Sequence, residues 1–396
     1  RELCLQIGKD LSNFSKYLKN INTLSVYGGA KIDKQIRSLK KRPQIIVGTP
    51  GRTKDLIKRK KLYLGNIKRL ILDESDEMLS MGFKDDLEFI IKSASKEKQI
   101  LLFSATMNSK VNAVTKKYMK NPFKISVASV NRAADNVDHL FYMVQARDRY
   151  EVVKRIADMN PDIYGIVFCR TRRETKEVAN KLMNDHYNAD TIHGDLTQNE
   201  RDDVMMRFRK RKLQILVATD VAARGLDVEE LTHVINYNLP DDDEIYVHRS
   251  GRTGRAGRNG ISIAIIHGRE RHRIKEIERK SGISFKRQRV PNGLEICKKR
   301  LYTLIDKIEK VRVNEDQIEQ FLPYIYDKLN WLDREQLIKH FVSTEFNRYL
   351  SYYRDARDIN IESNAHEKNH RKRPKRKRRK FHSSKRNRKN RRRKSS

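Results

Sequence analysis

Short apolar runs, separated by helical patterns, recur along most of this chain, and most of them end in polar or charged residues. In the first block the runs lie near residues 24–27, 44–47, 69–72 and 99–103. In the second block they lie near residues 164–168, 190–193, 213–217, 233–237 and 261–266. Helical stretches between them include 31–42, 84–95, 172–187 and 198–211. Strands that alternate with helices predict βαβ units, so the pattern indicates two α/β domains with parallel sheets.

The segment 246–260 is the most informative for chemistry, because it places one histidine and four arginines among glycines. These residues are His248, Arg249, Arg252, Arg255 and Arg258. Glycine lets the backbone approach a ligand closely. Guanidinium groups match phosphate oxygens in a bidentate geometry. We interpret the segment as a phosphate-binding element, and a solvated basic loop is the alternative.

An acidic turn follows the apolar run at 69–72. It contains Asp73, Glu74 and Asp76. In open α/β sheets, reactive groups gather at the carboxyl ends of the strands. One carboxylate there can hold Mg²⁺ through water, and a neighbouring one can position an attacking water. An acidic turn without a catalytic role is the alternative, since strands often end in this way.

The order of the motifs is more specific than any single motif. In chain order they are Thr49–Arg52, Asp73–Asp76, Ser104–Thr106, Ile166–Thr171, Ala218–Val228 and Tyr246–Gly260. This order resembles the DEAD-box family of ATP-dependent RNA helicases. The resemblance covers roughly residues 1–270. It implies two RecA-like domains, ATP and Mg²⁺ as cofactors, and RNA as the partner.

Two departures from the family pattern stand out. The family's glutamine motif and its P-loop are missing, because Gly8-Lys9 is followed by Asp10 and lacks the preceding glycine. The simplest explanation is an N-terminal truncation before the P-loop, which would leave the first sheet incomplete. We therefore expect residues 1–396 alone to hydrolyse ATP poorly or not at all. Ser75 stands where the family usually has alanine.

The resemblance also assigns roles on the ATP side of the site. Catalytic roles fall on Asp73, Glu74, Asp76, Arg252 and Arg255, with Asp73 holding Mg²⁺ through water. Coupling between hydrolysis and domain movement falls on Ser104, Thr106 and His248. Nucleotide contacts fall on Gly225 and Asp227. The arginines would stabilise charge on the γ-phosphate in the transition state.

RNA contacts are expected from strand-end loops of both domains. In the first domain they fall on Arg1, Gly28, Gly29, Thr49 and Arg52. In the second domain they fall on Arg170, Gly194, Gln198, Thr219 and Arg224. Backbone amides, hydroxyls and arginines contact phosphate and sugar, so we expect largely sequence-independent recognition of RNA.

The composition supports a polyanionic partner. The net charge is +36, and 17 basic residues with no acid lie in 371–394, so the rest of the chain is basic too. We expect nucleic acid rather than a membrane, because no apolar stretch approaches a membrane span and no signal peptide is visible. Three scattered cysteines fit neither a disulfide framework nor a metal site, so a cytoplasmic location is predicted.

The pattern changes after the second α/β block. Apolar residues recur at three- and four-residue steps over 290–357, which is typical of amphipathic helices. We interpret this region as a small all-helical module. By its position and pattern it resembles the dimerisation region that follows the core in cold-shock-type bacterial members of the family, which implies a possible homodimer; a helical extension packed on the second domain is the alternative. Residues from 364 onward have too few apolar side chains to fold, and we expect a disordered, basic RNA-binding tail.

These expectations define a domain plan and a function. The plan is a partial first domain at 1–127, a linker at 128–136, a second domain at 137–284, a helical module at 285–363 and a tail at 364–396. The predicted function is that of an ATP-dependent RNA helicase, which separates RNA duplexes locally as two domains close. The alternatives are an RNA-binding or annealing protein without catalysis, and a DNA helicase of the same superfamily.

Overall fold

The computed structural model describes residues 1–126, 136–223, 228 and 230–361. The predicted linker, apart from Asn136, lies outside the described residues. So do the predicted tail and three predicted site residues, Arg224, Gly225 and Asp227.

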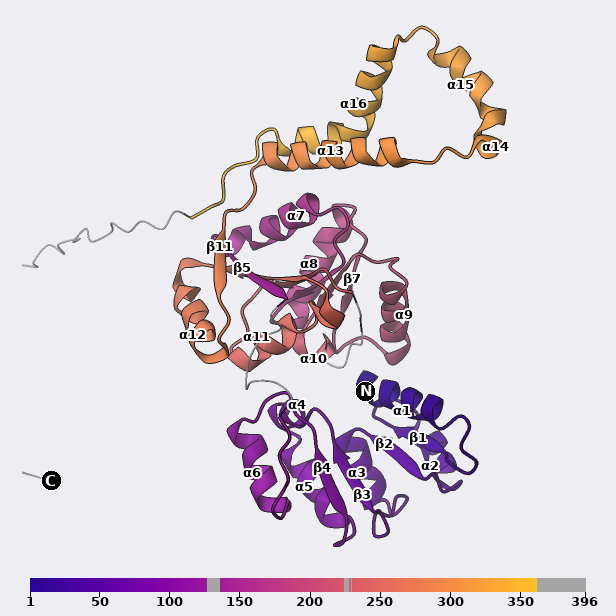
Figure 1. The fold of residues 1–396 in the computed structure, drawn as a ribbon, viewed down its shortest axis with the longest axis vertical. Helices are drawn as coiled ribbons and strands as arrows, with labels where there is room; N and C mark the ends of the chain where they lie inside the picture. Colours follow the sequence, from indigo (N-terminus) through magenta and orange to yellow (C-terminus); the bar gives the residue numbers. More distant parts are fainter. Residues whose placement is uncertain (127–135, 224–227, 229, 362–396) are drawn as a thin grey trace, which may run out of the picture. The chain divides into compact units, whose positions relative to one another are not determined.

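The first domain alternates strands and helices, as the sequence predicts (Figure 1). Its strands are β1 Thr23–Val26, β2 Ile45–Gly48, β3 Arg69–Leu72 and β4 Gln99–Leu102. Its helices are α1 Glu2–Phe14, α2 Ile32–Leu39, α3 Pro50–Lys58, α4 Ser75–Ser80, α5 Lys84–Ser93 and α6 Ser109–Tyr118.

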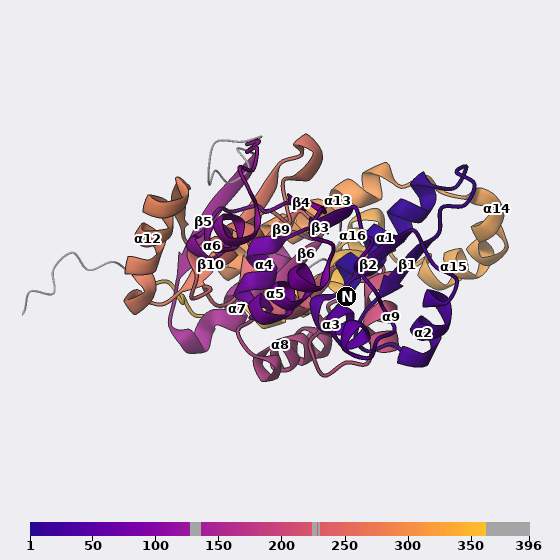
Figure 2. The same cartoon turned by 90° about the horizontal axis from the view of Figure 1, so that it is seen from below.

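The strands of the first domain form two separate parallel pairs, β1 with β2 and β3 with β4. Helix α1 lies against β1 and β2 (Figures 1 and 2). Each pair has its own small core, one around Val26 and Leu56 and the other around Leu72 and Val111. The second pair remains partly uncovered, since Ile71 within β3 is 56% exposed. Within the described residues, the first domain therefore contains two parallel pairs rather than one continuous sheet.

The second domain contains one large parallel sheet. Within the described residues its order is β11-β5-β10-β9-β6-β8-β7. The strands are β5 Val137–Met143, β6 Gly165–Phe168, β7 Ala189–Ile192, β8 Ile215–Ala218, β9 His233–Asn236, β10 Gly260–Ile266 and β11 Phe285–Gln288. The helices are α7 Arg149–Met159, α8 Arg172–Asn184, α9 Gln198–Arg209, α10 Asp220–Ala223, α11 Asp243–Ser250 and α12 Arg271–Ser281. Three 3-10 turns are η1 Ala146–Asp148, η2 Arg255–Gly257 and η3 Gly268–Glu270.

Both faces of this sheet are covered by helices (Figure 1). Helices α7 and α8 pack on one face, against side chains such as Val167 and Val217. Helices α9 and α12 pack on the other face, where α9 covers Ile166 and α12 covers Ala264. Strands buried on both faces explain why these runs are almost continuously apolar. The predicted fold of two RecA-like α/β domains is confirmed.

One strand of the second sheet, β11, has little signal in the sequence. Strand β11 has the sequence Phe-Lys-Arg-Gln, and Phe285 is its one buried residue. It lies at the edge of the sheet and pairs with β5, so that Phe285 is opposite His139. The second sheet therefore continues past residue 284, into the range that the domain plan gives to the helical module.

A helical region follows the sheet, which confirms that part of the predicted fold. Its elements are α13 Gly293–Lys310, α14 Glu315–Ile318, η4 Glu319–Phe321, α15 Leu322–Leu329 and α16 Arg334–Tyr353. Helices α13 and α16 begin with capping boxes at Asn292 and Asp333. In each box two orphan backbone donors are satisfied reciprocally, which fixes where the helix begins.

A buried carboxylate ties the base of the helical region to the second domain. Asp158 in α7 is 2% exposed. It accepts hydrogen bonds from Tyr187 at 2.6 Å, Tyr353 at 2.5 Å and Arg300 at 3.0 Å. Removing any partner would leave a buried charge less well satisfied, so this contact holds α13 and α16 on α7. None of the helices in the described residues is long and apolar enough to cross a membrane.

Two buried histidines of the second domain predict how its stability depends on pH. Burial lowers the pKa of His233 to about 4. Burial also lowers the pKa of His139 to about 4, although the charge of Asp138 opposes the shift. Below about pH 6.5 these histidines bind protons in the unfolded chain but remain neutral in the folded chain. The free energy of unfolding therefore decreases as the pH is lowered. Between about pH 7.5 and about pH 5, each histidine should lower the free energy of unfolding by about 2 kcal/mol.

Urea denaturation at both pH values tests this prediction. The variants His139→Asn and His233→Asn should each show a smaller loss of stability on acidification than the unmodified chain. His186→Asn is the matched control, because His186 is exposed and its positive φ of 63° suits asparagine. A loss unchanged by either buried substitution would contradict the prediction.

Candidate functional site

The acidic turn begins directly after β3. Asp73 is exposed, and its Oδ1 accepts a hydrogen bond from the Glu74 N–H at 2.9 Å. The Ser75 hydroxyl donates to the carbonyls of Leu72 at 3.2 Å and Phe103 at 3.0 Å. Ser75 therefore joins the ends of β3 and β4 and fits the site without displacing the three acids.

The backbone of Glu74 is strained. It precedes α4 in the left-handed conformation, with φ 48° and ψ 49°. A non-glycine residue in this region costs free energy and persists where its surroundings enforce it, often at functional sites. The Ser75 contacts provide such enforcement, and the side chain of Glu74 remains half-buried rather than packed away.

Asp76 connects the acidic turn to the segment after β4. Its Oδ2 accepts hydrogen bonds from the N–H and the hydroxyl of Thr106, both at 2.8 Å. The Asp76 N–H donates to the Ser104 hydroxyl at 3.3 Å. Asp76 and Thr106 are both buried, so the two segments are held together by satisfied polar groups. The structure thus brings together three predicted site residues.

His248 reaches Asp76 from the second domain. Its Nε2 lies 3.5 Å from Asp76 Oδ2, and its Nδ1 lies 3.1 Å from Glu77 Oε1. Burial opposes the charged ring, but the hydrogen bond to Asp76 and the charges of both carboxylates raise the pKa of His248. Burial likewise opposes ionisation of Asp76, but hydrogen bonds from His248 and Thr106 lower its pKa. The contact therefore stabilises this arrangement while His248 is protonated, and it weakens as pH rises through that raised pKa.

The arginines of the segment 246–260 occupy different environments. Arg249 is 3% exposed and binds both carboxylate oxygens of Asp220, at 2.5 and 2.8 Å. It also donates to Asn236 Oδ1 and the Asn238 carbonyl, each at 2.8 Å. Arg258 is exposed and forms an ion pair with Glu230. Arg249 is thus a structural residue, which the spacing of the arginines did not reveal.

The remaining two arginines lie on a tight turn. Arg252 and Arg255 are half-buried, and Arg255 Nε donates to the Gly251 carbonyl at 2.9 Å. Gly254 has φ 69°, and a Cβ there would meet Val137 Cγ2 at 2.5 Å. Larger residues are excluded at this position, so the turn has one backbone path between the two arginines.

The acidic turn can accept Mg²⁺ in one way. The described residues contain no group of three or more His, Cys, Asp or Glu side chains placed to hold a metal ion. Mg²⁺ commonly binds one or two carboxylates together with waters and substrate phosphates, so a full cage is unnecessary. The exposed carboxylate of Asp73 fits that mode. The sequence 1–396 contains no glycine-rich P-loop.

In the first domain, the predicted RNA-binding residues lie around the loop after β1. The Arg1 guanidinium covers Gly28 and Gly29, and a Cβ on Gly29 would meet Arg1 Nη1 at 2.7 Å. Arg52 donates to the Ala30 carbonyl at 3.2 Å and to Gln35 at 2.9 Å, so it braces this loop. Thr49 is the residue before α3, and its N–H donates to the Val26 carbonyl at 3.0 Å.

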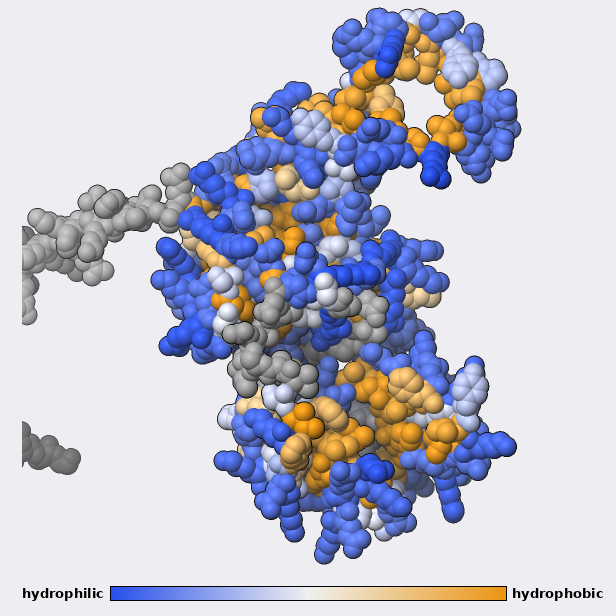
Figure 3. Space-filling model, viewed as in Figure 1, coloured by the Kyte–Doolittle hydropathy of each residue, from blue (hydrophilic) through white to orange (hydrophobic). Residues whose placement is uncertain are grey.

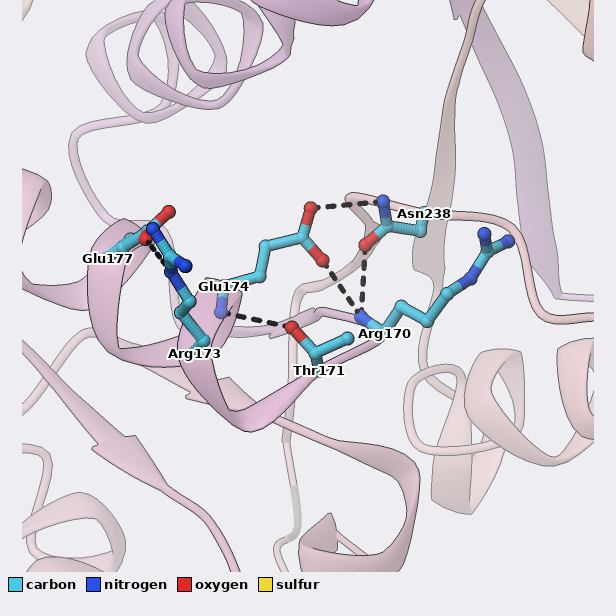
Figure 4. Close-up of a pocket in the computed structure, with 6 residues that line it drawn as sticks. All are labelled: Arg170, Thr171, Arg173, Glu174, Glu177 and Asn238. Carbon is cyan, nitrogen blue, oxygen red and sulfur yellow. Dashed lines mark hydrogen bonds and ion pairs between the residues drawn. The ribbon is translucent and has the colours of Figure 1, made fainter.

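In the second domain, Arg170 lines a shallow depression of about 360 Å³ (Figure 4). Its backbone N–H donates to Asn238 Oδ1 at 3.0 Å and to Glu174 Oε2 at 3.1 Å. Its guanidinium lies 3.2 Å from Asp241, and both side chains are more than half exposed. A solvent-exposed ion pair of this kind is weak, so a phosphate could replace the Asp241 carboxylate.

The other predicted RNA-binding residues of this domain lie at the ends of β7 and β8. Gly194 follows β7 and is covered by the guanidinium of Arg172. Gln198 begins α9, and its Nε2 donates to Asp202 at 3.0 Å. Thr219 follows β8, and its carbonyl accepts from the Ala222 N–H at 3.0 Å. The carboxyl ends of parallel strands thus gather these residues at one edge of the sheet.

Two charged residues that the sequence analysis missed connect the domains on this side. Arg201 in α9 is 8% exposed, and its Nη2 lies 2.7 Å from Glu2 Oε1 in α1. Arg201 also donates to the carbonyls of His193 and Ala222. Burial opposes ionisation of Glu2, but the charge of Arg201 lowers its pKa. The sequence offered one indication of this role, because Glu2 follows Arg1 and Arg201 lies three residues after Gln198, both predicted RNA-binding residues.

Family comparisons agree with this architecture. Residues 1–114 match the model described as DEAD/DEAH box helicase. Residues 148–257 match the model described as Helicase conserved C-terminal domain. Residues 296–354 match the model described as Probable ATP-dependent RNA helicase, helical domain.

Individual relatives give the same result. The chain is 40% identical to the ATP-dependent RNA helicase CshA of Listeria monocytogenes, over 84% of this chain and 64% of that protein. It is 41% identical to the DEAD-box ATP-dependent RNA helicase CshA of Bacillus cereus, over 80% of this chain and 60% of that protein. The chain therefore spans less than two thirds of the length of these curated relatives.

Solved structures extend the comparison to the fold. The structure of S. cerevisiae Dbp5 bound to RNA and ADP BeF3 is 29% identical in sequence, with a TM-score of 0.66. The match covers 76% of this chain and 79% of the Dbp5 chain. Mss116p bound to ssRNA and AMP-PNP is 27% identical, with a TM-score of 0.66, and covers 85% of this chain and 70% of its own. Taken with the family matches, these likenesses establish that the chain belongs to the DEAD-box helicase family.

The buried position of Arg249 generates a prediction about stability. Arg249→Lys keeps the charge but loses the bidentate contact with Asp220 and the donors to Asn236 and Asn238. The free energy of unfolding should fall by about 3 kcal/mol. Arg258→Lys is the control at an exposed ion pair and should change stability by less than about 0.5 kcal/mol. Equal effects in denaturant titrations would show that Arg249 is no more structural than Arg258.

Proposed function

We propose that this chain is the catalytic region of an ATP-dependent RNA helicase that separates RNA duplexes locally as its two α/β domains close. The observation that supports this proposal best is the network around Asp76. That carboxylate contacts Thr106 in its own domain and His248 in the other. Asp73 and Glu74 precede it in the same turn, and Arg252 and Arg255 follow His248 along the chain. Groups on one side of the site thus respond to the position of the other domain.

Each residue has a specific part in this proposal. Bound ATP with Mg²⁺ would supply the phosphoryl group whose transfer to water releases free energy. Asp73 would hold the water shell of the metal, and the strained Glu74 would orient the attacking water. Arg252 and Arg255 would stabilise charge on the transferred phosphate. Gly225 and Asp227 would contact the nucleotide, a role that rests on the family resemblance.

RNA would bind along the strand-end loops of both domains. Arg1, with Gly28 and Gly29, offers a guanidinium and close backbone approach in the first domain. Arg170, Gly194 and Gln198 offer similar chemistry in the second. The ion pair between Glu2 and Arg201 would join the two halves of this surface. Contacts of this type recognise phosphate and sugar, so little sequence preference is expected.

We further propose the domain division given above, with the second sheet extended to residue 288, and a cytoplasmic location. Three free, buried cysteines support a reducing compartment. The basic residues beyond 363 would form an additional RNA-binding arm.

An RNA-binding protein without catalysis, or a DNA helicase, is the competing function. RNA-stimulated against DNA-stimulated ATP turnover separates the three.

Self-association through the helical module is the second part of the proposal. Apolar side chains line the inner side of the ring formed by α13 to α16 (Figure 3). The exposed apolar residues of this region include Phe321, which is 58% exposed, and Ile338, which is 54% exposed. Exposed apolar surface of this extent marks an interaction site, and a second copy offers a matching surface.

Catalytic roles predict a specific pattern in mutants. In a form of the protein that carries a P-loop ahead of residue 1, Glu74→Gln should lower kcat by about 10²-fold or more. Arg255→Ala should lower kcat by about 10³-fold. RNA binding should persist in both variants, because neither residue lies on the proposed RNA surface. Arg258→Ala is the matched control and should retain the turnover of the parent. Full turnover in either test variant would remove the role given to that residue.

Self-association predicts a change in mass that depends on the module. Tyr324→Ser with Trp331→Ser removes two exposed aromatic side chains, which are 68% and 66% exposed, without touching the base anchored by Asp158. Sedimentation should then show a monomer where the parent chain is a dimer. Tyr63→Ser removes an equally exposed tyrosine from the first domain and should leave the dimer intact. A parent chain that sediments as a monomer would contradict the proposal.

A further inference from the structure

Glu244 makes a further contact between the two α/β domains, separate from those of His248 and Arg201. It lies in the first turn of α11, where its N–H donates to Asp242 Oδ1 at 3.0 Å. Its Oε2 accepts a hydrogen bond from Asn108 Nδ2 at 3.1 Å and lies 3.3 Å from the Thr106 hydroxyl. Both partners belong to the segment after β4 in the first domain.

Thr106 cannot serve both carboxylates at once. Its hydroxyl has one proton, and the oxygen lies 2.8 Å from Asp76 Oδ2 but 3.3 Å from Glu244 Oε2. The shorter contact keeps the proton on the Asp76 side. Asn108 is oriented by its own cap contact, since its Oδ1 accepts from the Val111 N–H at 3.0 Å. The Asn108 amide nitrogen therefore faces Glu244 and is the donor that joins the domains.

The spacing of Glu244 and His248 along α11 lets both residues contact the first domain. Glu244 and His248 are four residues apart, so both side chains lie on one face of the helix. His248 contacts the turn after β3, through Asp76 and Glu77, while Glu244 contacts the segment after β4. Buried Tyr246 and Arg249 fix α11 within the second domain, so two contacts one turn apart hold that domain in one orientation against the first domain more firmly than one contact would. The turn that carries Arg252 and Arg255 begins where α11 ends.

We propose that Glu244 is a positioning residue that latches the second domain onto Asn108 and so sets the orientation of α11 and of the arginine turn that follows it. The value of this latch for hydrolysis rests on the proposed function. The latch itself is a contact between two named side chains, and it can be tested without nucleotide.

Fluorescence energy transfer between two dyes, one on each domain of the full chain, tests the latch. It measures the ratio of molecules with the domains in contact (closed) to molecules with the domains apart (open). Lys92→Cys and Lys275→Cys place labels at exposed positions of α5 and α12, and the three native cysteines are buried. Asn108→Ala and Glu244→Ala should each lower the closed-to-open ratio by about tenfold, with or without a short oligouridine strand. The double variant should lose no more than either single variant, because both remove the same hydrogen bond. Glu276→Gln removes a charge paired inside the second domain and should leave the ratio unchanged.

Charge exchange separates positioning from a general structural effect. Asn108→Asp faces Glu244 with a like charge and should lower the ratio further than alanine does, and adding Glu244→Lys should restore it. The proposal would be overturned if the losses of the two single variants added up in the double variant. It would also be overturned if Glu244→Lys failed to restore the ratio in a chain with unchanged circular dichroism, or if the parent chain had no closed population. A different outcome is that the Asn108 and Glu244 variants change the ratio as expected, but a form of the protein that carries a P-loop shows no RNA-stimulated ATP turnover. That outcome would support the latch and reject the proposed function.

Discussion

The hydrogen bonds of Asp76 are the interaction on which the rest of the site depends. This carboxylate accepts the N–H and the hydroxyl of Thr106 and faces His248. Because it is buried, it needs these partners, and Thr106 and His248 come from different domains of the chain. The two strand ends of the first domain and one helix of the second are thereby linked through a single side chain. The raised pKa of His248 and the lowered pKa of Asp76 express the same mutual dependence.

Parallel sheets explain why so many polar residues meet at such points. Every strand of both domains runs in the same direction as its partner, so the loops that leave the carboxyl ends share one edge. The acidic turn, the Thr49 loop and the Arg170 loop all follow this rule. The helical region obeys a different constraint. Its base is fixed by the buried Asp158, while α15 exposes Tyr324 and Tyr326 to solvent. One region therefore combines a rigid attachment with an apolar surface that its own domain leaves uncovered.

Much of the fold could be predicted from local pattern because apolar runs and helical spacing are strong signals. Strands β3, β6 and β10 fall close to their predicted ranges for that reason. The edge strand β11 could not be predicted, since Lys286, Arg287 and Gln288 face solvent and one buried phenylalanine is no pattern. In the site, residue type predicted a phosphate-binding role for the arginine-rich segment. It could not show that Arg249 is buried against Asp220 while Arg258 lies at the surface.

The sequence by itself determined the α/β class, the order of the motifs, the amphipathic helices and the basic character, because each depends on residue type and on short spacing. Tertiary structure alone decided the partners. The pairs Glu2 with Arg201, Asp76 with His248 and Asn108 with Glu244 join residues that are more than one hundred positions apart. No local pattern encodes such pairs, since they form only when sheet packing and the contact between domains bring distant loops within hydrogen-bond distance.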